Sequence, residues 1–170
     1  MTKCVGALFL VLAGLFMGQG VLRRRTGHIR ELENLASALF LLSAEIAVHL
    51  SPMETALTVT AREAAPEVRP FFRGVSEGLA ALGARSFGEI WAETAAEMFP
   101  RLTPRELRWL SEPGGSLGSY DSTAQARALE RCIGQLRQEA ARLQEELERN
   151  RKLWPGLGAG AAALLAVLLI

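Results

Sequence analysis

The chain has 170 residues, and its 19 Lys and Arg against 18 Asp and Glu give no strong positive field for nucleic acid. A single Tyr and a low aromatic content also leave little stacking surface for single strands. The two cysteines, Cys4 and Cys132, have no CxxC spacing and no neighbouring histidine. We therefore expect no disulfide framework, no metal, no cofactor and no nucleic-acid partner.

The first feature along the chain is an uncharged apolar segment at residues 4–22. It is long enough to cross a hydrocarbon core of about 30 Å at 1.5 Å per residue. The arginines Arg23, Arg24 and Arg25 follow it directly, as a stop-transfer signal would. The segment is predicted to be a transmembrane helix. A cleaved secretory signal is the alternative, but the apolar run is long and no clear A-x-A cleavage site follows.

A second uncharged apolar segment occupies residues 154–170. It lies near the lower length limit for a membrane span. The alternative, a buried core helix, is disfavoured because the segment has no polar face to turn to water. Basic residues precede this segment and follow the first one, so the positive-inside rule places both inner flanks in the cytoplasm. The sequence thus predicts two transmembrane helices around a cytoplasmic domain at residues 26–152.

Helix signals dominate this central domain and strand signals are nearly absent. Apolar residues recur at steps of three and four from Ile29 to Ile46, as in an amphipathic helix. The pair Ser51-Pro52 predicts a break and a second helix over 53–62. Prolines at 66 and 70 predict another break before a helix near 71–82, which Gly83 ends.

Two capping boxes predict the next helix starts. Ser86 with Glu89 opens a helix to about residue 99, and Thr103 with Glu106 opens another. The glycine-rich stretch 112–121 is predicted to be a loop, without the GxGxxG or P-loop pattern of a nucleotide site. Asp121 is predicted to cap the longest helix, 122–152.

That last helix carries a sustained apolar seam at heptad spacing. Its members are Ala126, Leu129, Ile133, Leu136, Ala140, Leu143 and Leu147. The seam can pack inside the chain's own bundle or pair with a partner chain, and we favour the first because the shorter helices also need a surface to cover. The expected fold is all-α: a bundle of about six helices flanked by an N-terminal and a C-terminal transmembrane helix.

No catalytic constellation is recognisable. His28 and His49 have no metal-ligand spacing, and no serine lies in a G-x-S-x-G elbow. Glu45, between apolar residues, is either a buried carboxylate with a perturbed pKa or a helix-edge residue paired with an arginine; we favour the second. We expect that the protein is not an enzyme.

Two short motifs stand out along the chain: Ser51 to Ala56, with Pro52 and Glu54, and the set Leu117, Gly118, Asp121 and Gln125 at the start of the last helix. In their order and spacing, these motifs resemble the stage III sporulation protein AB family over essentially the whole chain. The first is similar to the family's T/S-P-L-x-E-A stretch, although Met53 replaces the usual Leu. The second is similar to its L-G-x-x-D-x-x-x-Q signature, and Glu45 falls in the similar first helix.

The resemblance implies a fold like the cytoplasmic domain of the F-type platform proteins of type II secretion and type IV pilus machines. It implies a protein of the mother-cell membrane, facing the forespore, that couples a cytoplasmic ATPase similar to stage III sporulation protein AA to a channel complex. The loops and the turn from Leu117 to Gln125 would contact that ATPase, while Asp121 is first a helix cap. The alternative function is a dimeric membrane sensor signalling through its long last helix.

Overall fold

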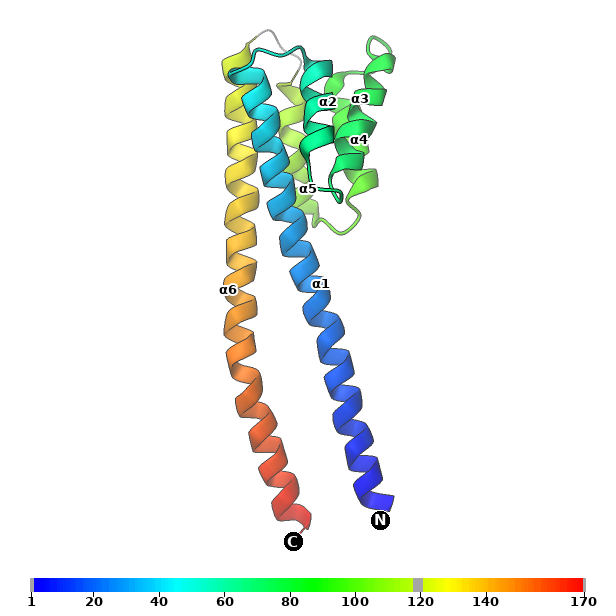
Figure 1. Cartoon of the computed structure of the whole chain (residues 1–170), viewed down its shortest axis with the longest axis vertical. Helices are drawn as coiled ribbons and strands as arrows, with labels where there is room; N and C mark the ends of the chain where they lie inside the picture. The colour runs from blue at the N-terminus through cyan, green and yellow to red at the C-terminus, as the bar shows by residue number, and fades with distance from the viewer. Residues whose placement is uncertain (1, 118–120, 170) are drawn as a thin grey trace. The chain divides into compact units, whose positions relative to one another are not determined.

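The structure, a computed structural model, describes the backbone of residues 2–117 and 121–169 and the side chains of residues 25–117, 121 and 123–149. Its α-helices are α1 (Thr2–Ala47), α2 (Met53–Glu63), α3 (Arg69–Gly78), α4 (Phe87–Met98), α5 (Pro104–Ser111) and α6 (Ser122–Leu169) (Figure 1). Two short 3-10 helices, η1 (Leu79–Ala81) and η2 (Glu112–Gly115), join them. The described residues contain six α-helices and no strand, which confirms the all-α prediction.

The chain divides into two compact units. One combines Met1–Ile29 with Ala141–Ile170, and the other is the helical bundle Arg30–Ala140. The predicted spans, 4–22 and 154–170, fall in the first unit and outside the residues whose side chains are described. Within the described part, none of the helices has the length and apolarity needed to cross a membrane.

Aromatic side chains from α3, from α4 and from the residue that follows α4 form the centre of the bundle. The rings of Phe71 and Trp91 meet edge to face with centroids 4.8 Å apart, and Phe99 lies 5.4 Å from Phe71. Such pairs contribute roughly 0.5–1.5 kcal/mol each beyond their burial. The indole Nε1 of Trp91 donates to the backbone oxygen of Leu110 at 2.6 Å. This bond satisfies the polar atom of a fully buried ring and ties α4 to α5.

The apolar seam of α6 packs within the same bundle. Leu129, Ile133, Leu136 and Ala140 are buried, whereas Leu143 and Leu147 are half-buried. The intramolecular interpretation is therefore correct up to Ala140. The sensor alternative loses most of its dimer interface, because the first three of these side chains are already covered by the chain itself.

The local boundaries differ from the prediction at two places. Helix α3 begins at Arg69, two residues early, and its α-form ends at Gly78 before η1 and a turn in which Gly83 has a φ of 104°. The predicted loop at 112–121 begins instead as η2, with Pro113 and Gly114 buried. The loop prediction was wrong for this part. Glycine there allows close packing of the backbone and does not make the segment an irregular loop.

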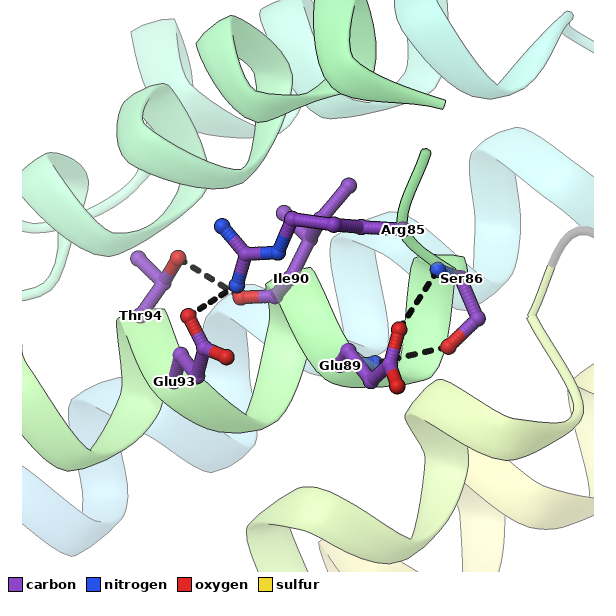
Figure 2. Close-up of polar contacts among 6 residues, drawn as sticks. All are labelled: Arg85, Ser86, Glu89, Ile90, Glu93 and Thr94. Atoms are coloured by element: carbon purple, nitrogen blue, oxygen red, sulfur yellow. Dashed lines mark hydrogen bonds and ion pairs between the residues drawn. The ribbon is translucent and has the colours of Figure 1, made fainter. Parts of the chain in front are cut away.

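Both predicted capping boxes are present. At the start of α4, the backbone NH of Ser86 donates to the Glu89 carboxylate at 2.8 Å, and the NH of Glu89 donates back to the Ser86 hydroxyl at 3.3 Å (Figure 2). The bond from the Ser86 backbone is the main reason that the pKa of Glu89 lies below its ordinary value. Arg85 reaches over the same turn to pair with Glu93. Thr103 and Glu106 repeat the box at α5.

Candidate functional site

In the corner between α1 and α2, residues Val48–Pro52, two backbone hydrogen bonds span five and six residues instead of the four of an α-helix. The NH of His49 bonds to the oxygen of Ala44 at 3.2 Å, and the NH of Ser51 bonds to the oxygen of Glu45 at 2.9 Å. Between them Leu50 adopts a φ of 52°, in the left-handed region. A side chain with a Cβ pays roughly 1–2 kcal/mol for that conformation. The surrounding hydrogen bonds hold the strain in place.

Glu45 is the side-chain anchor of this corner. Its carboxylate accepts the Ser51 hydroxyl at 2.8 Å and the Nδ1–H of His49 at 2.9 Å. The bond from His49, followed by that from Ser51, lowers the pKa of Glu45 below its ordinary value. Our expectation of an arginine partner was wrong: the carboxylate stabilises the turn that follows its own helix.

The three polar groups at the corner do not form a hydrolase triad. In such a triad the histidine lies between the nucleophile and the carboxylate, so that it can accept the proton of the nucleophile. Here Glu45 lies between Ser51 and His49, and the serine hydroxyl donates to the carboxylate. Nor do the described residues contain a group of His, Cys, Asp and Glu that could hold a metal ion. The geometry fits a structural clamp.

Large apolar side chains are exposed around this clamp. They form what we call the corner patch: Phe40, Leu41, Val48 and Leu50. Val48 and Leu50 are each 73% exposed. On α1, steps of three and four residues place Phe40, Ala44 and Val48 along one stripe. Clustered exposed apolar side chains mark interaction sites, whereas single scattered ones need no explanation.

Helix α6 borders the corner patch. The guanidinium of Arg137 lies 5.9 Å from the centre of the Phe40 ring, a cation–π contact between the two helices. Within the bundle, the C-terminal end of α1 and the N-terminal end of α6 lie at the same end, as Figure 1 shows. The corner patch therefore has an apolar centre and an arginine at its edge, a composition typical of protein interfaces.

The residues predicted from the family motifs have different roles. Leu117 and Gln125 are buried, so they support the bundle and are not available to a partner. Asp121 is exposed, and its Oδ1 accepts the backbone NH groups of Thr123 at 3.0 Å and Ala124 at 3.1 Å, which confirms the cap. Gly118 lies outside the described residues.

Pro52 and Glu54 continue from the corner patch onto α2, and both are exposed. Pro52 is the N-cap of α2, at φ −54° and ψ 146°. It therefore precedes the first helical turn instead of lying in it. Glu54 lies in the first turn, where a negative charge interacts favourably with the helix dipole. Among the predicted residues that the structure describes, these two and Asp121 are exposed.

Sequence reasoning missed the corner patch, although one signal was present. Leu39, Phe40, Leu41 and Leu42 are four consecutive apolar residues on one helix. A helix cannot turn four successive side chains toward a single core, because each is rotated about 100° from the last. Leu39 and Leu42 are buried, and Phe40 and Leu41 are left exposed.

Comparison with known proteins identifies the family to which this chain belongs. The stage III sporulation protein AB family profile matches residues 3–170. This chain belongs to that family. Stage III sporulation protein AB of Bacillus subtilis (strain 168) is 27% identical over 172 residues, with both chains fully covered. A solved structure of a stage III sporulation protein AB aligns with a TM-score of 0.60 at 25% identity, covering 69% of this chain and 94% of that one.

Membership in the stage III sporulation protein AB family confirms the resemblance seen in the motifs and assigns the protein to sporulation. The similarity in structure also shows that its helices follow the same fold. Because the buried members of the motifs, Leu117 and Gln125, pack inside the bundle, that part of the signature reports the fold rather than a contact surface.

Proposed function

We propose that this protein is a membrane component of a sporulation-specific, secretion-like channel between mother cell and forespore, where it couples a cytoplasmic ATPase to the membrane assembly. Family membership supports the link to sporulation. The apolar segments 4–22 and 154–170, with arginines at their inner flanks, support anchoring with the helical bundle in the cytoplasm. The bundle then serves as the platform that the ATPase, similar to stage III sporulation protein AA, contacts.

The corner patch is the observation that carries the coupling role. Val48 and Leu50 expose most of their apolar surface, although a serine or asparagine at either position would be better solvated. Leu50 does so in a strained backbone conformation. Strain of this kind, held by a local hydrogen-bonded clamp, is typical of residues positioned for contact. We assign the ATPase as the occupant, with its apolar side chains covering this corner.

Binding of the full-length chain to the ATPase tests this assignment directly. The chain is reconstituted in nanodiscs, and the affinity of the neighbouring ATPase is measured without nucleotide, with ADP and with a non-hydrolysable ATP analogue. Val48→Ser and Leu50→Asn are expected to weaken binding by about tenfold, the effect of losing an interface anchor. Leu82→Asn is the matched control, because Leu82 is also an exposed leucine but lies outside the corner patch, in the turn between η1 and α4.

Two results would contradict the proposal. Absence of ATPase binding in every nucleotide state removes the coupling role. An equal loss for Leu82→Asn and Leu50→Asn removes the corner patch as the contact site.

The membrane topology has its own test. In a chain lacking Cys4 and Cys132, an Ala84→Cys substitution places a single thiol in an exposed turn of the bundle. A membrane-impermeant maleimide is expected to label it only after the cells are permeabilised, because the bundle is cytoplasmic. Labelling of intact cells would exclude a cytoplasmic ATPase as the partner.

A further inference from the structure

A groove at the surface of the bundle, whose lining residues are separate from the corner patch, gathers arginines from two helices. It has a volume of about 510 Å³ and is lined by α2 and α3. The lining residues are Thr58, Ala61, Arg62, Arg69, Arg73, Ser76 and Glu77. Three arginines and one glutamate therefore line the same concavity.

The arginines of this groove are poorly matched to acceptors within the chain. The Nε of Arg69 is buried without a hydrogen-bond partner, while its Nη2 donates to the backbone oxygen of Ala64 at 3.1 Å. The bond to Ala64 holds the guanidinium at the wall of the groove. A buried donor without an acceptor costs about 1–3 kcal/mol, so an anion that draws the Arg69 guanidinium toward it relieves that cost.

Arg73 and Arg62 add donors at the same place. Arg73 is exposed and lies four residues before Glu77 on α3, the order in which an i,i+4 ion pair is the weaker one. Arg62 directs its Nε to Glu63 at 3.1 Å, which leaves its two Nη groups without an acceptor among the described residues. Guanidinium groups match the oxygens of phosphate and carboxylate in a two-pronged geometry.

We propose that this groove binds a phosphoryl-bearing anion. One guanidinium fork suffices for a carboxylate, whereas the tetrahedral phosphoryl group presents two or three free oxygens that point in different directions, which several guanidinium groups can bind together. The hydroxyl of Ser76 lies in the same lining and offers a further donor. The source is either a small soluble phosphate compound or a phospholipid headgroup, which share this chemistry.

Calorimetric titration of the full-length chain in phosphatidylcholine nanodiscs tests the inference. The buffer contains no phosphate, and its ionic strength is held constant. Pyrophosphate represents the soluble source, glycerophosphoglycerol the headgroup source, and acetate a simple carboxylate. We expect saturable binding of pyrophosphate, of glycerophosphoglycerol or of both, and at least tenfold weaker binding of acetate. Whichever phosphoryl probe binds more tightly identifies the source.

Substitutions locate the site. Arg69→Gln and Arg73→Gln are each expected to weaken binding by about tenfold or more, as loss of a charge-assisted hydrogen bond requires. Arg73→Gln keeps the test valid if loss of the Arg69 bond to Ala64 unfolds the chain, since Arg73 is exposed. Arg101→Gln, at an exposed position outside the groove, is the matched control and is expected to change nothing.

Three results would overturn the inference: no saturable binding of either phosphoryl probe, acetate binding as tight as that of pyrophosphate, or an equal loss of affinity in Arg101→Gln and Arg73→Gln. The last would show a general response to net charge.

Discussion

Gly114 lies directly against the indole side chain of Trp91. A Cβ added at residue 114 would come within 2.9 Å of the Cβ, Cγ and Cδ1 atoms of the tryptophan. Trp91 is fully buried and held by its hydrogen bond to Leu110, so the ring cannot withdraw without losing that bond. The glycine allows η2 to close over the aromatic centre of the bundle.

This contact predicts that Gly114→Ala is destabilising. The added methyl group forces Trp91 or η2 to move, and overpacking of this kind costs about 1–3 kcal/mol. Gly115→Ala is the control, because a Cβ there would meet nothing within 4 Å. Chemical denaturation of the two variants measures the difference, and equal stabilities would show that η2 yields without cost.

Replacing Leu50 by asparagine is expected to stabilise the protein while weakening ATPase binding. Asparagine tolerates the left-handed conformation at φ 52°, so about 1 kcal/mol of strain is relieved. Leu82→Asn provides the control, since Leu82 has an ordinary φ of −59° and no strain to relieve. Thermal unfolding measures the effect. A loss of stability in Leu50→Asn would mean that the leucine side chain supports the corner instead.

The capping box of α4 is expected to contribute about 1 kcal/mol to folding. Ser86→Ala removes the oxygen that accepts the NH of Glu89, leaving a helix-end donor to water. Ser37→Ala is the matched control: its hydroxyl only donates to the oxygen of Glu33, within a continuous helix. Denaturation midpoints should fall for the first variant alone, and a similar fall in both would show that hydroxyl loss, rather than capping, is measured.

Cys132 is expected to resist thiol reagents in the folded protein. Burial, with a smaller contribution from the charge of Glu112, raises the pKa of its thiol to about 12. At pH 8 only about one molecule in ten thousand then carries the reactive thiolate. A Cys4→Ser chain should therefore label slowly until denaturant is added.

The raised pKa of Cys132 also makes the free energy of unfolding depend on pH. Because the folded pKa lies above the ordinary value of 9.0, the contribution of Cys132 is complete below pH 9.0 and is lost as the pH rises toward 12. Cys132→Ala should lack this component of the alkaline decline. Rapid labelling of the folded chain at pH 8 would contradict the burial of this thiol.

Glu45 should stabilise the corner at neutral pH and lose that effect in acid. Its pKa in the folded chain lies below the ordinary value of 4.5, so its contribution is present above pH 4.5 and disappears as the pH falls through the folded value. The pH dependence of unfolding in Glu45→Gln should be correspondingly weaker. Ser51→Ala, which removes one hydrogen bond to the Glu45 carboxylate but keeps the carboxylate, should show an intermediate pH dependence. Identical pH profiles for all three would remove Glu45 from the clamp.

The parts of the fold that depend on neighbouring residues were predictable. Ser86 and Glu89 satisfy each other's backbone within one turn, and Asp121 accepts the NH groups two and three residues ahead. Capping of this kind involves residues within one turn of each other, so the local amino-acid sequence suffices to locate it. Helix periodicity likewise predicted the buried face of α1 and the seam of α6.

Contacts between distant residues were not predictable from spacing alone. Glu45 was expected to pair with an arginine, but the backbone of the corner brought Ser51 and His49 to it. Leu117 and Gln125 were expected at a contact surface, and the packing of the bundle buried them. Each outcome depends on how the chain turns after a helix ends, which the helix pattern does not encode.

The sequence by itself determined where the capped helices α4, α5 and α6 start, that the helices are amphipathic, and which family the protein resembles, because all three depend on the order of nearby residues along the chain. Only the tertiary structure decided which of Leu39, Phe40, Leu41 and Leu42 are covered, and that Arg62, Arg69 and Arg73 share one groove. Burial and convergence are properties of how helices pack against one another. An apolar or charged residue therefore acquires its role only when a second helix covers it or leaves it open.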